Sequence, residues 1–95
     1  MADNPNRAFI AHLRKATVRG ERLAEDHNVL AEFIVRDGGL TIRATASNKL
    51  GKMAWLETVP WPTLETDDAA TIDAAVEAAV LEAVERVRDL IKQGV

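Results

Sequence analysis

The chain has 95 residues, of which 47% are hydrophobic and 28% are charged, and its formal net charge is −3. This length and composition indicate one globular domain with a single core and argue against disorder. The absence of cysteine excludes disulfides, thiolate nucleophiles and sulfur-ligated metal sites. No apolar run is long enough to span a membrane and the N-terminus lacks a signal-peptide pattern, so we expect a soluble, cytoplasmic protein.

The charges are unevenly distributed along the chain. Residues 1–52 carry nine Lys or Arg against six Asp or Glu, whereas residues 53–95 carry three against nine. An excess of positive charge in one segment is typical of a protein that contacts a polyanion, but two oppositely charged solvated surfaces would give the same pattern. Charge alone leaves both interpretations open.

A first helix is expected from Asn4-Pro5, because Asn can cap a helix and Pro fits its first position. Apolar residues then recur at helical spacing on one face: Phe9, Leu13, Ala16, Leu23 and Ala24. Gly20 lies on the same face, where it could break the helix or allow another part of the chain to approach closely. The other side of this helix is basic, with Arg7, Arg14, Lys15, Arg19 and Arg22.

A β-hairpin is expected around Asp37-Gly38-Gly39, because the flanking segments alternate between apolar and polar residues and glycine tolerates the positive φ of a tight turn. A two-residue loop at Asp37-Gly38 places Glu32 opposite Arg43, where opposite charges attract. The same loop puts the apolar residues of both strands on one face, and pairs Val35 with Leu40, Phe33 with Ile42 and Ala31 with Ala44.

Residues 53–59 are expected to form a third strand after a turn at residues 48–51. Pro60 and Pro62 should end this strand, because proline cannot donate to a strand ladder. They hold Trp61 near the edge of the sheet. There it could act as a lid over the end of the core or as a contact for a partner.

The two faces of this sheet are not equally apolar. Met53 and Trp55 fall on the face of the paired apolar residues, where they fill space beside alanines. Leu30, Ile34 and Leu56 fall on the opposite face, which an antiparallel sheet under one helix layer usually leaves to water. We therefore expect a partner, such as a second copy, to cover part of that face.

The longest helix is expected after Asp67 and Asp68, whose carboxylates can cap its start. Gly94 stands where this helix can stop. Its apolar stripe is broad: Ile72, Val76, Ala79, Val80, Ala83, Val84, Val87, Leu90 and Ile91. The stripe is wider than packing on a three-stranded sheet requires, so it predicts either dimer packing or a second helix within the chain.

These elements predict an α+β fold in the order helix, three antiparallel strands, helix (α-β-β-β-α), which we expect to form a dimer. The chain should form a single domain over residues 1–95, with frayed ends at residues 1–5 and 93–95. It contains no internal repeat, linker or low-complexity run.

Three stretches between residues 38 and 90 carry a family resemblance: GGLTIRATASN, TVPWPTLETDD and DDAATIDAAVEAAVLEAVERV. Together with the element order, they resemble the YbaB/EbfC family of bacterial nucleoid-associated DNA-binding proteins. The chain departs from that family at Val59, where an acidic residue is usual, and in a shorter, basic first helix that contains Gly20. The resemblance implies a homodimer that binds duplex DNA with little sequence preference, has no enzymatic activity and needs no cofactor.

Basic residues are the candidates for DNA contact, because phosphates are bound non-specifically by clustered cations. These candidates are Arg14, Lys15, Arg19, Arg22, Lys49 and Lys52. Alternatively, they are solvated side chains, some of them paired with Glu21, Glu25 or Asp26. The candidate residues for a dimer or partner interface are Leu30, Ile34, Leu56 and Trp61.

We find no pattern that supports a metal site or catalysis. His12 and His27 lack further ligands for a metal, and Asp67-Asp68 is explained by helix capping without a nucleophile or phosphate loop nearby. We therefore expect no enzymatic activity and no metal.

The leading hypothesis is a non-enzymatic DNA-binding protein of the nucleoid, acting as a homodimer with little sequence preference. The alternative is a small protein-binding adaptor, chaperone or inhibitor, for example a phage-encoded modulator of a host complex. An RNA-binding domain of the same layout fits less well, because such domains usually have a Lys-rich motif at the start of the last helix, where this chain has Asp67-Asp68.

Overall fold

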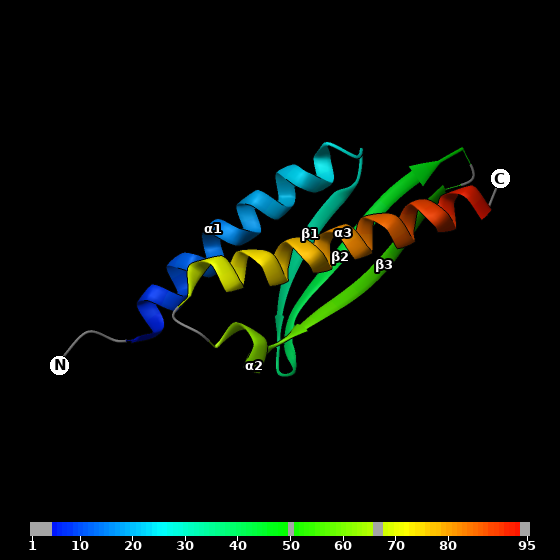
Figure 1. Cartoon of the computed structure of the whole chain (residues 1–95). Helices are drawn as coiled ribbons and strands as arrows, with labels where there is room; N and C mark the ends of the chain where they lie inside the picture. The colour runs from blue at the N-terminus through cyan, green and yellow to red at the C-terminus, as the bar shows by residue number, and fades with distance from the viewer. Residues whose placement is uncertain (1–4, 50, 66–67, 94–95) are drawn as a thin grey trace.

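The computed structural model describes residues 5–49, 51–65 and 68–93, with side chains from Ile10 onward. Figure 1 shows a three-stranded antiparallel sheet of order β1-β2-β3 crossed by two long helices. The elements are α1 (Pro5–Glu25), β1 (Leu30–Arg36), β2 (Gly39–Asn48), β3 (Gly51–Pro60), α2 (Trp61–Leu64) and α3 (Ala69–Gln93). The expected α+β fold is confirmed, apart from the one-turn α2 that the sequence analysis did not predict.

The register of the β1–β2 hairpin is the predicted one. Val35 pairs with Leu40, and Glu32 pairs with Arg43. The guanidinium of Arg43 donates to Glu32 over 2.8 Å on the exposed face. The helices do not cover one corner of the apolar face of the sheet, because Val35 lies on this face and its side chain is 73% exposed.

The positive φ of this hairpin lies at Gly39, the first residue of β2, and not within the Asp37-Gly38 loop. Gly39 has a φ of 155° and pairs with both Arg36 and Pro60. A Cβ at this position would overlap the carbonyl oxygen of Val59. Gly39 is therefore required both by the backbone conformation and by the close approach of β3.

The core lies between one face of the sheet and the two long helices. Helix α3 packs on β2 and β3, and α1 packs against α3 and β1 (Figure 1). The largest fully buried side chains are Leu40, Ile42, Leu64, Ile72, Val76, Val80 and Val87. The surplus width of the α3 stripe is thus used by a second helix of the same chain.

Helix α1 continues through Gly20 without a break. A Cβ at Gly20 would lie 3.0 Å from both the Phe33 ring and a methyl group of Val80. Of the two roles left open by the sequence, the structure shows the second: Gly20 lets α1 approach the sheet and α3 closely.

Helix α1 ends in a Schellman motif centred on Asn28, which has a φ of 60°. The amide of Val29 donates to the carbonyl of Ala24 over 3.0 Å, and that of Asn28 donates to Glu25 over 2.9 Å. Val29 and Ala24 are both buried, which supplies the apolar contact that usually accompanies this motif. The motif fixes where α1 ends and β1 begins.

Asp68 caps the start of α3, as the sequence predicts, whereas Asp67 and Gly94 lie outside the described residues. The Asp68 carboxylate accepts from the amide of Ala70 over 3.1 Å and from the hydroxyl of Thr71 over 2.7 Å. These hydrogen bonds, above all the one from Thr71, lower the pKa of Asp68 below its ordinary value of 3.8.

The Asp68 cap should make stability depend on pH in acid. Because the pKa is lower in the folded chain than in the unfolded one, the carboxylate stabilises the fold above pH 3.8, and this contribution disappears as the pH falls through the folded pKa. Asp68→Asn keeps a cap acceptor without the charge. Thermal denaturation should therefore show the wild type to be more stable than Asp68→Asn at pH 7 and equal to it in acid. An equal difference at every pH would contradict this.

Candidate nucleic-acid interface

Arg14, Lys15 and Arg22 lie on the exposed side of α1, away from the core. Among the residues that the structure describes, none of the three forms an ion pair, and the alternative pairing with Glu21, Glu25 or Asp26 is not observed within 4.0 Å. Their charges are therefore available to a ligand. The Arg7 side chain lies outside the described ones.

Arg19 differs from the other candidates on α1, because its guanidinium donates to the carboxylate of Asp73 on α3 over 2.9 Å. This ion pair crosses the groove between the helices, which encloses about 440 Å³ and is lined by residues of both charges, including Arg22, Asp26 and Glu77. Carboxylates stand on both walls of the groove, Asp26 at the end of α1 and Glu77 on α3, and would repel phosphates. The arrangement favours ligand contact on the outer side of α1, where Arg14 and Lys15 lie outside the groove and Arg22 borders it.

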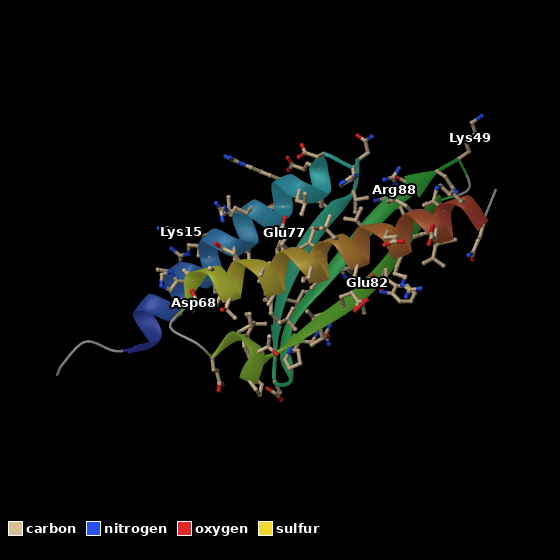
Figure 2. All side chains as sticks on the ribbon, in the orientation of Figure 1. Lys15, Lys49, Asp68, Glu77, Glu82 and Arg88 are labelled. Carbon is tan, nitrogen blue, oxygen red and sulfur yellow. The ribbon has the colours of Figure 1, made fainter. Side chains whose placement is uncertain are left out.

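Lys49 and Lys52 are exposed and lie at the turn between β2 and β3 rather than on α1. Figure 2 shows Lys49 at the tip of the β2–β3 hairpin and Lys15 on α1, toward opposite ends of the molecule. The longest dimension of the molecule is 56 Å. A single chain thus presents two separate groups of cations rather than one patch of six.

Two of the cations on the sheet and on α3 are paired with carboxylates, Arg43 with Glu32 and Arg86 with Glu82. Arg86 donates to Glu82 over 2.9 Å, and this hydrogen bond raises the pKa of Arg86. The same guanidinium lies 5.7 Å from the ring centre of Trp55, whose Nε1 donates to Glu57. The sequence analysis missed this cluster, because it depends on how α3 crosses β3.

The interface candidates on the sheet share its open face, except for Trp61. Leu30 is 56% and Leu56 is 54% exposed, and Ile34 is half-buried on the same face. Trp61 packs against the core beyond the end of β3, and its Nε1 donates to the carbonyl of Arg36 over 2.8 Å. The sequence left two roles open for Trp61, and this position fits a lid over the end of the core rather than an exposed contact.

Comparisons with protein-family models, curated proteins and solved structures give no match. The resemblance to the YbaB/EbfC family therefore rests on the residues quoted above. Within the described ranges, no helix is long and apolar enough to cross a membrane, and no cluster of His, Asp or Glu could hold a metal ion.

Proposed function

We propose that this chain is a non-enzymatic, largely sequence-independent DNA-binding protein of the nucleoid-associated kind, which acts as a homodimer. The observation that carries the proposal is the group of exposed cations on one side of α1, Arg14, Lys15 and Arg22, without an ion pair in the described part of the chain. Cations that are not neutralised by the protein itself are the ones that can release counterions from DNA phosphates.

The homodimer would form through the open face of the sheet. Leu30 and Leu56 are more than half exposed there, and the Glu32–Arg43 pair beside them supplies both charges, so the face is self-complementary under two-fold symmetry. A dimer would carry two basic α1 surfaces on one particle. When one dimer binds a single DNA molecule through both surfaces, its affinity exceeds that of either surface alone without any new contact.

Fluorescence anisotropy with a labelled duplex over a range of salt concentrations tests the proposal. If Arg14, Lys15 and Arg22 each neutralise one phosphate, the logarithm of the association constant should fall with the logarithm of salt with a slope of about −3 for one chain and about −5 for a dimer. The same slope is expected for unrelated duplex sequences. No binding at low salt would refute the proposal.

The dimer makes a separate prediction. Leu30→Asp/Leu56→Asp should give a monomer by sedimentation, because it places charge in an apolar interface. The free energy of unfolding of the monomer should change by less than about 1 kcal/mol, since both side chains are largely exposed. Val35→Asp, at an exposed valine on the other face of the sheet, is the control and should leave the dimer intact. A wild-type chain that sediments as a monomer would contradict the prediction.

The open sheet face also favours a second candidate, a protein-binding adaptor. Exposed apolar side chains at Leu30 and Leu56 would bind a hydrophobic partner in a salt-tolerant way. This candidate becomes the better one if the chain is monomeric and the duplex does not bind.

A further inference from the structure

Strand β3 forms an open edge of the sheet. The order of the described strands is β1-β2-β3, so β3 has a hydrogen-bonded neighbour on one side only, and it lies on the side of the sheet away from α1 (Figure 1). It has ten residues, whereas β1 at the other edge has seven. An unpaired strand edge presents a row of N–H and C=O groups that can pair with a further strand.

The strand register identifies the backbone groups that face this edge. Asn48 pairs with Gly51 across a two-residue turn, and the two residues that flank such a turn exchange hydrogen bonds with each other. From Gly51 onward, every second residue of β3 therefore bonds to β2, and the residues between them direct their N–H and C=O groups outward. The outward residues are Lys52, Ala54, Leu56 and Thr58, and all four are exposed.

The edge of β1 is less accessible. The same alternation, counted from the pairing of Arg36 with Gly39, assigns its outward backbone groups to Ala31, Phe33 and Val35. Ala31 is buried and Phe33 is half-buried, because α1 packs against β1. Of the two edges, β3 is therefore the one that another chain can reach along its length.

Side chains on the helix side of β3 make the surroundings of this edge acidic. Arg86 of α3 lies 5.7 Å from the ring centre of Trp55 and donates to Glu82 over 2.9 Å. The hydrogen bond to Glu82 raises the pKa of this guanidinium, and the charges of Glu85 and Glu57 act in the same direction. Three carboxylates thus act on one cation. In the described part of the chain, neither Glu57 nor Glu85 forms an ion pair.

The other side of the same edge is mainly apolar. Ala54 and Leu56 project onto the open face of the sheet, where Leu56 is 54% exposed. Lys52 is the one basic residue of β3 and stands beside the hairpin turn. Because side chains of a strand alternate between the two faces, an added strand would meet carboxylates and Trp55 on one side and apolar side chains on the other.

We propose that the edge of β3 binds an extended segment of another protein in which basic and apolar residues alternate. The segment would pair with residues 52–58 as an antiparallel fourth strand, with its backbone bonded to the outward N–H and C=O groups. Its basic side chains would lie beside Glu57 and Trp55, since a cation is attracted both to a carboxylate and to an aromatic ring. Its apolar side chains would cover Leu56.

Charge favours this occupant over a second copy of the chain. Two copies that paired their β3 strands would bring two sets of the carboxylates Glu57 and Glu85 to one edge, and like charges on neighbouring strands repel. A basic segment neutralises them instead. The inference goes beyond DNA binding and does not depend on it, because no residue of the outer side of α1 takes part.

Fluorescence anisotropy with the labelled peptide Lys-Val-Lys-Ile-Lys-Val-Lys tests the inference without DNA. We expect saturable binding to the full-length chain at low salt. The peptide Lys-Lys-Lys-Lys-Val-Ile-Val has the same composition without the alternation, and should bind at least about tenfold more weakly because it matches neither side of the edge.

Methylated peptides test the backbone pairing without changing the protein. In the proposed register the apolar residues pair with Ala54 and Leu56, so their N–H groups bond to β3 and those of the lysines point away. Methylation of the apolar residues' amide nitrogens should therefore weaken binding at least about tenfold, whereas methylation of the lysines' amide nitrogens should change it by less than about threefold.

Substitutions in the protein locate the edge. Ala54→Pro removes an outward N–H but no hydrogen bond to β2, and should weaken peptide binding about tenfold. Val35→Pro makes the same change at the edge of β1 and should leave binding unchanged. Circular dichroism checks that both variants are folded.

A second pair of variants tests the charge. Glu57→Gln/Glu85→Gln keeps an acceptor for the Nε1 of Trp55 and should weaken binding about fivefold, because two attractive charges are lost. Glu21→Gln/Glu25→Gln removes two exposed charges from α1 and should change binding by less than about twofold.

Four results would each overturn the inference. The first is that the alternating peptide does not bind at low salt, and the second is that the peptide with contiguous lysines binds equally well. The third is that methylation of the apolar residues has no effect. The fourth is a homodimer that Ala54→Pro converts to a monomer, which would assign this edge to a second copy of the chain.

Discussion

Reversing two charges on α1 with Arg14→Glu/Arg22→Glu is expected to weaken duplex binding by about 100-fold at low salt. Each substitution removes one phosphate contact and adds a repulsive charge, and a homodimer carries the change twice. Because both side chains are exposed and form no ion pair in the described part of the chain, the fold should be unaffected. Fluorescence anisotropy gives the affinity, and circular dichroism checks the fold.

A control variant with the same net charge distinguishes DNA contact at a defined surface from attraction by the overall charge of the protein. Arg88 and Lys92 are exposed on α3 and belong neither to the outer side of α1 nor to the open sheet face. Arg88→Glu/Lys92→Glu should weaken binding by less than about threefold, because these residues would affect DNA only through long-range, screened charge. If the two double variants weaken binding equally, α1 is not the DNA surface.

Replacing Gly39 with alanine is expected to have the largest effect on stability, about 4 kcal/mol. Two costs combine. A φ of 155° is strained for any residue with a side chain, and the new Cβ would overlap the Val59 carbonyl oxygen while lying 3.0 Å from the Cα of Pro60. Since these neighbours are backbone atoms of β3, relief requires the β2–β3 pairing to open. Chemical denaturation measures the loss.

The adjacent glycine is the natural control for this prediction. A Cβ at Gly38 would have no atom within 4 Å, so Gly38→Ala should change the free energy of unfolding by less than about 1 kcal/mol. Similar losses in the two variants would mean that the hairpin does not have the described geometry.

The strand register could be predicted because it is determined by residues close together in the sequence. Alternation and the two-residue loop set the pairing of Val35 with Leu40 and the Glu32–Arg43 ion pair. A one-residue slip would have turned every apolar side chain to water, so only one register was compatible with a core. The starts of the long helices were also readable, since α1 begins at Pro5 and Asp68 caps α3 within one turn of its own position; the expected cap Asn4 lies outside the described residues.

Features that depend on distant parts of the chain could not be predicted. The role of Gly20 is decided by Phe33 and Val80, which approach it from β1 and α3. Trp61 was placed near the sheet edge, but its hydrogen bond to the Arg36 carbonyl and the one-turn α2 around it depend on how β3 ends beside β1 and β2.

The exposure of single candidate residues was predictable, but their arrangement as a surface was not. Helical spacing predicted an exposed side of α1 with Arg14, Lys15, Arg19 and Arg22, and these side chains are exposed. It did not show that Arg19 pairs with Asp73 across the groove, nor that Lys49 lies at the far tip of the β2–β3 hairpin. Both depend on the direction in which α1 crosses α3 and the sheet, which local patterns do not specify.

The central claim is that the outer side of α1 contacts duplex DNA, and amide chemical shifts during a titration of the ¹⁵N-labelled chain with a short duplex test it most directly. The account predicts that the signals of Arg14, Lys15, Val18 and Arg22 shift progressively and return when salt is added, while those of Leu30, Ile34 and Leu56 stay in place. Shifts confined to the sheet, or none at low salt, would contradict it.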